Sequence, residues 1–300
     1  MRGPRSRSTV DIGGYLPSES TRCGYLLRLS RPRFWLYLAG PVLVGCVYAA
    51  KTANDLFQPI PLALLGYFLV PANVFLYGIN DIFDADIDAH NAKKTEREVR
   101  YEGSSFVVTV VLTCGLLGCA FIPILPPEAS VSLIGVLVLA VEYSAPPFRF
   151  KTTPVFDSLS NGLYIIPGIT AYAAITGDYP PTGAVAGGWL WAMGMHTFSA
   201  IPDIEPDRQA GIETTATVLG ERGTYTYCTV CWLAASLVFA VVHPFFAVIL
   251  LVYPLLAISI RRSSVSVTKA YWWFPVINTF TGLVFTLGGV WLLVFGGIHG

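Results

Sequence analysis

The sequence has few charged side chains, because Asp, Glu, Lys and Arg together make up only 13% of its 300 residues. Soluble domains usually contain about 25% charged residues, so a soluble chain of this length could not cover its surface. Apolar residues account for 54% of the chain, and the mean hydropathy is +0.59. These values exclude a soluble dinucleotide-binding enzyme and a disordered chain. They predict an all-α protein embedded in a membrane.

Several other signals are absent. The 19 basic and 19 acidic residues balance, so no nucleic-acid partner is indicated. Residues 1–25 are polar and contain no apolar core of a signal peptide, so we expect a cytoplasmic tail. Five of the six cysteines lie in apolar segments, which favours packing over disulfide formation. The chain also lacks a nucleophile elbow, a phosphate-binding loop and zinc-ligand spacing.

Long apolar segments fill the rest of the chain, and a segment of about 20 residues is enough to cross a bilayer. The sequence contains nine of them, roughly 34–50, 60–79, 105–125, 129–143, 155–176, 182–201, 224–242, 244–260 and 274–296. Each should be a continuous helix, because lipid cannot satisfy free backbone groups. Prolines within them, such as Pro41, Pro71 and Pro167, are interpreted as kinks. We therefore expect residues 26–300 to form one domain with nine transmembrane helices.

The charges are distributed unevenly between the two sets of loops. If the amino terminus is cytoplasmic, Lys51 is the only one of the 19 Lys and Arg residues on the opposite side. This asymmetry follows the positive-inside rule and predicts a cell-membrane protein of that orientation. Most acidic residues also fall on the cytoplasmic side, which topology does not require. We therefore expect the chemistry to take place at that face.

The first acidic cluster directly follows the second apolar segment. Asn80, Asp84 and Asp88 are spaced i, i+4, i+8, so a helix that continues through them would present all three on one face. Oxygen ligands spaced in this way suit Mg²⁺, which shares its coordination shell with substrate phosphates. Asp81 lies beside them and is interpreted as an outer-shell or solvated residue.

A second acidic cluster ends the sixth apolar segment. Asp203 and Asp207 are again four residues apart, and Pro206 could either sit in a first helical turn or break the helix. Glu205 would point elsewhere and is interpreted as a possible outer-shell residue. Two acidic helix ends on the same side of a bundle can clamp a diphosphate through bridging metal ions.

Basic side chains accompany these clusters. Lys93 follows the first cluster, while Tyr143, Arg149 and Lys151 belong to the connection between the fourth and fifth segments. Arg can bind phosphate oxygens bidentately and Lys acts as a point charge, so this set is predicted to bind a diphosphate. His196, within the sixth segment, is interpreted as a packed or hydrogen-bonded residue.

The paired motifs resemble those of the UbiA superfamily of intramembrane prenyltransferases. Asn80-Asp81-x-x-Asp84-x-x-x-Asp88 is similar to the first family motif, and Asp203-x-x-x-Asp207 to the second. The resemblance implies a helical bundle around a central cavity and a Mg²⁺-dependent transfer of a prenyl group from its diphosphate. It also implies that Asp84, Asp203 and Asp207 serve catalysis and that Asn80 and Asp88 complete the metal ligands.

Within that superfamily, four segments are similar to the carotenoid-directed branch, the lycopene elongases. They are Arg31–Pro41, Asn80–Asp88, Lys93–Arg100 and Ile201–Gly220. This resemblance implies transfer of a dimethylallyl group from dimethylallyl diphosphate to the terminal double bond of lycopene. The resulting cation would be quenched by water or by proton loss.

Other functions stay open at this point. The same mechanism could act on an aromatic quinone precursor or a glycerol phosphate ether. Such polar acceptors need a cationic anchor in the pocket, which only a loop residue such as Arg97 or Arg208 could supply. A cation-coupled carrier would place its ion sites near the bilayer midplane, whereas both acidic clusters lie at one edge.

Overall fold

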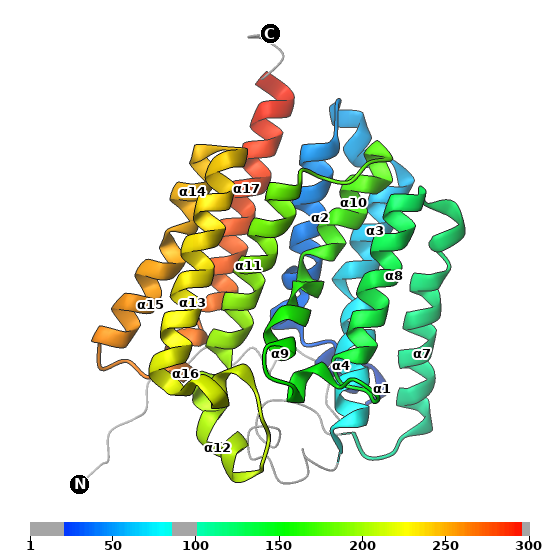
Figure 1. The fold of residues 1–300 in the computed structure, drawn as a ribbon. Coiled ribbons are helices and arrows are strands. Elements are labelled where there is room, and N and C mark those ends of the chain that lie inside the picture. The colour runs from blue at the N-terminus through cyan, green and yellow to red at the C-terminus, as the bar shows by residue number, and fades with distance from the viewer. Residues whose placement is uncertain (1–20, 86–100, 296–300) are drawn as a thin grey trace, which may run out of the picture.

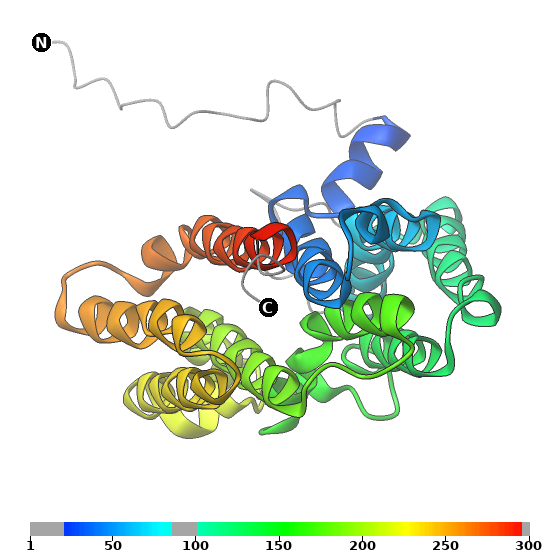
Figure 2. The ribbon, with the colours of Figure 1, turned by 90° about the horizontal axis from the view of Figure 1, so that it is seen from above.

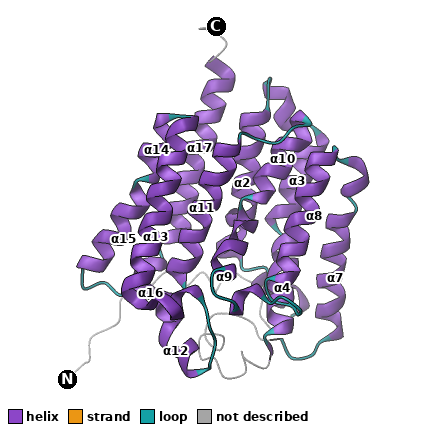
Figure 3. Cartoon of the chain, viewed as in Figure 1, coloured by secondary structure: helices purple, strands orange, loops and turns teal. Residues whose placement is uncertain are grey.

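The computed structural model describes residues 21–85 and 101–295, which form a bundle of helices (Figure 1). These residues contain no strand (Figure 3), so the predicted all-α class is confirmed. The α-helices are, in chain order, α1 (Arg22–Leu29), α2 (Trp35–Ala49), α3 (Pro59–Leu69), α4 (Pro71–Phe83), α7 (Ser105–Cys119), α8 (Pro127–Glu142), α9 (Phe156–Leu159), α10 (Ile166–Thr176), α11 (Thr182–Ser199), α12 (Ile204–Gln209), α13 (Thr215–Val242), α14 (Pro244–Leu250), α15 (Val252–Arg262), α16 (Val267–Tyr271) and α17 (Phe274–Phe295). Asp88 and Lys93 lie outside the described residues.

Helix occupies each of the nine predicted apolar ranges. By length and composition, five helical stretches of the described chain could cross a membrane: Pro59–Phe83, Ser105–Ile124, Thr215–Val242, Pro244–Arg262 and Val267–Phe295. The helices over the remaining ranges are shorter, so the count of nine crossings stays a prediction. Large apolar side chains cover the outside of the bundle, as in Leu116, Leu237 and Val241, which are 69%, 72% and 88% exposed. Exposed apolar surface on this scale suits a lipid environment.

One of the prolines acts differently from the prediction. Pro41 lies inside α2. Pro71 follows a break at Val70, whose φ and ψ are −126° and −60°, within the helical stretch Pro59–Phe83, as expected of a kink. Pro167 instead stands near the start of α10, after a short 3₁₀ segment at Ser160–Tyr164, so no continuous helix passes through it.

A buried side chain donates hydrogen bonds to the backbone carbonyl oxygens left free where α3 ends and α4 begins. The Nδ2 atom of Asn73 donates hydrogen bonds to the carbonyl oxygens of Phe68 and Leu69, each at 3.0 Å. Asn73 is fully buried, and a carbonyl left without a donor there would be costly. This pairing lets the chain change direction just before the first acidic motif.

The helices are arranged in a ring when viewed along the bundle (Figure 2). One buried apolar cluster joins residues of α2, α3, α4, α7, α8 and α10, and a second joins residues of α11, α13, α14, α15 and the start of α17. Within the first cluster, α2 and α10 approach closely at two glycines. A Cβ on Gly45 would collide with the carbonyl oxygen of Gly168. A Cβ on Gly168 would lie 2.7 Å from the carbonyl oxygen of Pro41.

We predict that Gly168→Ala lowers the free energy of unfolding by about 1–3 kcal/mol, since the added methyl forces two backbones apart. Gly66→Ala is the matched control, because nothing lies within 4 Å of a Cβ built there. Thermal unfolding of both variants in detergent measures the difference. Equal melting temperatures for Gly168→Ala and the parent protein would contradict the proposed close contact.

Candidate active site

The first acidic motif lies at the carboxyl end of α4. Asn80 is in the last turn, and Asp84 caps the helix with its backbone N–H donated to the carbonyl of Asn80 at 3.0 Å. The two side chains are therefore one turn apart, as predicted. The Nδ2 atom of Asn80 donates to Oγ of Ser144 at 3.0 Å, which leaves the amide oxygen as the atom that could ligate a metal.

Asp84 is paired with two of the predicted phosphate-binding cations. Its Oδ1 atom lies 3.1 Å from Nη2 of Arg149 and also contacts Nζ of Lys151. The residue is only 8% exposed, and a carboxylate this buried requires such partners. The backbone N–H of Lys151 donates to the carbonyl of Tyr143 at 3.0 Å. The connection between α8 and α9 thus folds back and brings both cations to the end of α4.

Two features of Arg149 indicate that it can bind a ligand in addition to pairing with Asp84. Its φ is +43°, in the left-handed region that residues with a side chain seldom occupy. Its Nε atom is buried and has no hydrogen-bond acceptor among the described residues. Buried donors normally have a partner, so this guanidinium has a donor left for an anionic ligand.

Asp81 faces a different partner, Arg31, which the sequence did not single out as a site residue. Nη2 of Arg31 lies 3.1 Å from Oδ1 of Asp81, and its guanidinium carbon lies 4.5 Å from the centre of the Tyr77 ring. Arg31 also has a positive φ, +49°. Burial raises the pKa of Tyr25 in α1 to about 12, and the negative charge of Asp81 adds to this shift. In the sequence, Arg31 stood out only as the first residue of the Arg31–Pro41 segment that is similar to the carotenoid-directed branch.

The second acidic motif begins a short helix. Asp203 ends a 3₁₀ turn at Ile201–Asp203, and Asp207 lies in α12. Pro206 occupies the first turn of α12 and does not break it, which resolves the ambiguity left by the sequence. Asp203 and Asp207 are half-buried, whereas the Glu205 side chain is 72% exposed and lies 3.7 Å from Arg208. The end of α4 and α12 lie at the same end of the bundle (Figure 1).

The metal ligands remain a prediction. Within residues 21–85 and 101–295, no three His, Cys, Asp or Glu side chains come close enough to hold a metal ion. The predicted ligand Asp88 lies outside these ranges. The donors that are described, the amide oxygen of Asn80 and the carboxylates of Asp84, Asp203 and Asp207, are all oxygens. This donor set fits a hard cation such as Mg²⁺.

A cavity of about 220 Å³ lies inside the bundle and reaches Asn80 of the first motif. Its aromatic lining residues are Phe34, Tyr37, Tyr77, Tyr143, Tyr164, Trp191 and Tyr271. Its polar lining residues are Arg31, Asn80, Asn161, His196, Ser199 and Asn278, and its aliphatic ones are Leu76, Leu163, Ala192 and Met195. The lining therefore joins residues of both apolar clusters around a mostly aromatic space.

Three of the hydrogen bonds that involve side chains of this lining are pairings that the sequence did not predict. The hydroxyl of Tyr143 lies 3.3 Å from Nε2 of His196. Nδ2 of Asn278 donates to the hydroxyl of Tyr37 at 3.0 Å, while Oδ1 of Asn278 accepts from that of Tyr253 at 2.8 Å. The partners come from helices far apart in the chain, so only the tertiary structure brings them together.

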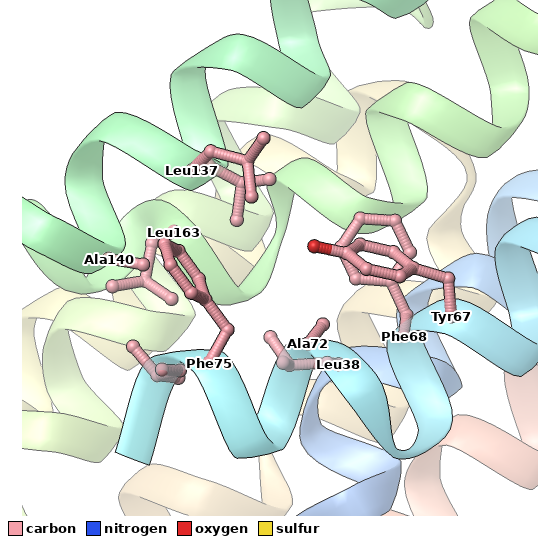
Figure 4. Close-up of a pocket in the computed structure, with 10 residues that line it drawn as sticks. Leu38, Tyr67, Phe68, Ala72, Phe75, Leu137, Ala140 and Leu163 are labelled. Atoms are coloured by element: carbon pink, nitrogen blue, oxygen red, sulfur yellow. The ribbon is translucent and has the colours of Figure 1, made fainter. Parts of the chain in front are cut away.

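A second, much smaller pocket lies between α2, α3, α4 and α8 (Figure 4). Its volume is about 10 Å³, which is about enough for one water molecule. Its lining is apolar except for the hydroxyl of Tyr67, which points into it (Figure 4) and has no hydrogen-bond partner among the described residues. This pocket is too small to bind an organic substrate.

Comparison with known proteins identifies the family of this chain. Residues 38–274 match the UbiA prenyltransferase family. The chain belongs to this family. It is 60% identical over 289 residues to a protein of Haloarcula japonica named lycopene elongase/hydratase, covering 96% of this chain and 98% of that protein. It is 59% identical to the protein of the same name from Halobacterium salinarum, over 91% of this chain and 99% of that protein.

The fold is also that of UbiA proteins. A UbiA homolog from Archaeoglobus fulgidus, solved with DMAPP and Mg²⁺ bound, superposes with a TM-score of 0.67 at 21% sequence identity. The match covers 89% of this chain and 99% of that one. The predicted family and the predicted prenyltransferase class are thereby confirmed, and the UbiA-family site can be sought among the residues described above.

We predict that Asp84→Ala and Asp203→Ala lower prenyl transfer by at least about 10²-fold, since each would remove a carboxylate predicted to hold the Mg²⁺ that binds the diphosphate. Glu205→Ala should cost much less, because that side chain points outward. Turnover with a labelled prenyl diphosphate at saturating Mg²⁺ measures the three variants. Near-normal activity of Asp84→Ala would show that the first motif does not serve catalysis.

Proposed function

We propose that this UbiA-family enzyme transfers a dimethylallyl group to the terminal double bond of lycopene and that the product cation is then hydrated. The observation that carries the proposal is the aromatic and aliphatic cavity that begins at Asn80, next to the group formed by Asp84, Arg149 and Lys151. A hydrocarbon acceptor fits such a lining. The 60% identical relative bears the name lycopene elongase/hydratase, which supports the same acceptor.

The diphosphate of dimethylallyl diphosphate would bind at the end of α4. Arg149 supplies its buried Nε donor and Lys151 a point charge, and Lys93 and Tyr143 are the remaining proposed phosphate ligands. Binding there would exchange part of the ion pairing to Asp84 for pairing to phosphate oxygens. Because these cations already stand in place, little side-chain ordering accompanies substrate binding.

Asn80, Asp84, Asp88, Asp203 and Asp207 would hold Mg²⁺ beside the diphosphate. The ion, when bound, supplies positive charge that stabilises the leaving group. Asp203 and Asp207 of the second motif would complete the site opposite Asp84. Arg149 and Lys151 would balance the negative charge that builds on the departing diphosphate.

Cleavage of the C–O bond leaves diphosphate with the electron pair and a dimethylallyl cation in the cavity. The aromatic rings of Tyr164 and Trp191, which line the cavity, can stabilise that cation. The terminal double bond of the acceptor then forms the new C–C bond. The positive charge passes to the tertiary carbon of the acceptor, which is quenched by water or by loss of a proton.

Polar acceptors fit the lining of the cavity less well than a hydrocarbon does. An aromatic acid or a glycerol phosphate ether needs a cation whose charge is not already balanced, and within the described lining the one cation is Arg31. That guanidinium is paired with Asp81 at 3.1 Å. Arg208, the loop residue that could have folded inward, donates instead to the carbonyl of Thr217 and does not line the cavity. A cation-coupled carrier agrees with the structure less well still. Its ion sites would lie near the bilayer midplane, whereas both acidic motifs lie at one end of the bundle (Figure 1).

The proposal includes the placement in the membrane. Residues 26–300 would form one transmembrane domain, with the amino terminus and both acidic motifs on the cytoplasmic side. The distribution of Lys and Arg supports this orientation, and a water-soluble diphosphate could then reach the motifs from the cytoplasm. The apolar acceptor could reach the cavity only from the lipid.

Expression in a lycopene-accumulating bacterium tests the function directly. We expect mass analysis of the extracted carotenoids to show lycopene extended by one or two C5 units, each with an added water. Unchanged lycopene in a strain with well-expressed protein would contradict the acceptor assignment. The same membranes would then be assayed with aromatic and glycerol phosphate acceptors and a labelled prenyl diphosphate.

We also predict that Arg149→Met raises KM for dimethylallyl diphosphate by at least about tenfold, because charge-assisted hydrogen bonds to phosphate are lost. Arg222→Met is the matched control, since Arg222 is exposed on α13. Steady-state kinetics at saturating acceptor separates KM from kcat. An unchanged KM for Arg149→Met would mean that the diphosphate binds elsewhere.

A further inference from the structure

His196 has no role in the proposed transfer step, and Tyr143, its hydrogen-bonding partner, enters that step only as a proposed ligand of the diphosphate. Tyr143 follows the last residue of α8, and His196 lies in the last turn of α11. The hydroxyl oxygen and Nε2 are 3.3 Å apart, and the two rings meet edge to face with their centres 5.9 Å apart. Both residues line the 220 Å³ cavity. The pair therefore presents a coupled hydroxyl and imidazole to the space where the acceptor would lie.

His196 differs chemically from every other residue of the described lining. Its imidazole can accept a proton at a ring nitrogen, whereas amides, alcohols and neutral phenols do so far less readily, and Arg31 is already cationic. Tyr143 can donate its proton to Nε2 while its oxygen accepts one from another group. Such an arrangement passes a proton from the cavity to the imidazole.

The position of the pair along the bundle suits the second half of the reaction. His196 precedes Asp203 by seven residues, which is about 10 Å of helical rise. Unlike Asp203, His196 lines the cavity. It therefore borders the space where the acceptor would lie and where the tertiary cation would form after C–C bond formation.

We propose that Tyr143 and His196 are the proton-accepting pair that directs water onto the acceptor cation and so produces a tertiary alcohol. This inference rests on the proposed function. The oxygen of a water molecule forms a bond to the tertiary carbon, and the water proton passes to the Tyr143 oxygen as the phenolic proton passes to Nε2 of His196. Without the pair, the cation loses a proton from carbon to the departing diphosphate and gives an alkene of the same carbon number.

The ratio of hydroxylated to non-hydroxylated C5-extended carotenoid tests this assignment. We expect His196→Gln and Tyr143→Phe each to lower that ratio by at least about tenfold, the lower end of a general-base effect. In His196→Gln, diphosphate release should stay within about threefold of the parent enzyme, because ionisation is not affected. Tyr67→Phe removes a hydroxyl that has no partner among the described residues, so it should change neither quantity.

The possible results separate the two proposals. A parent enzyme that makes no C5-extended product contradicts the proposed function. Extended products whose hydroxylated fraction is the same in the parent and both variants overturn the role of the pair and leave prenyl transfer intact. An increase in KM for dimethylallyl diphosphate in Tyr143→Phe, with an unchanged product ratio, would also overturn it and assign that hydroxyl to diphosphate binding alone. If His196→Gln fails to fold, Tyr143→Phe decides the question.

Discussion

The site is organised by the pairing of one buried carboxylate with two cations at the end of an apolar bundle. Asp84 is nearly inaccessible, and its charge is tolerated because Arg149 and Lys151 contact it. This pairing ties the end of α4 to the connection after α8. It also places both cations beside a carboxylate of the first acidic motif. Two cations beside one carboxylate leave the group with a net positive charge, which suits an anionic ligand.

The cavity depends on the division of the bundle into two apolar clusters. Residues on one side of it come from α2, α4 and the Ser160–Tyr164 segment, and those on the other from α11, α16 and α17. The close contact of α2 with α10 stabilises the first side, and the hydrogen bonds of Asn278 join α2 to α15 and α17. The aromatic space is thus held open by packing around it. Several of its polar groups have hydrogen-bond partners, as in the pairs Tyr143–His196 and Tyr37–Asn278.

Hydropathy was sufficient to predict the helices, since each apolar range proved helical. It could not show where helices end, because Pro71 and Pro167 are compatible with both a kink and a new start. Spacing predicted that Asn80 and Asp84 share a turn, and it grouped Arg149 and Lys151 with the site. Arg31 was not recognised as a site residue, since its contact is with Asp81, 50 residues away in the chain. His196 was predicted to be packed or hydrogen-bonded, which its contact with Tyr143 confirms, but the sequence could not name that partner, 53 residues away. Periodicity carries no information about contacts at such separations.

The central claim is that a divalent cation and the Asp84 cluster together bind the diphosphate. Isothermal titration calorimetry with a non-ionising dimethylallyl diphosphate analogue tests it most directly, using the purified protein before and after removal of Mg²⁺ by chelation. We predict that affinity falls by at least about tenfold without Mg²⁺, and that Asp84→Asn loses this Mg²⁺ dependence. Equal affinity with and without Mg²⁺ in the parent protein would contradict the account.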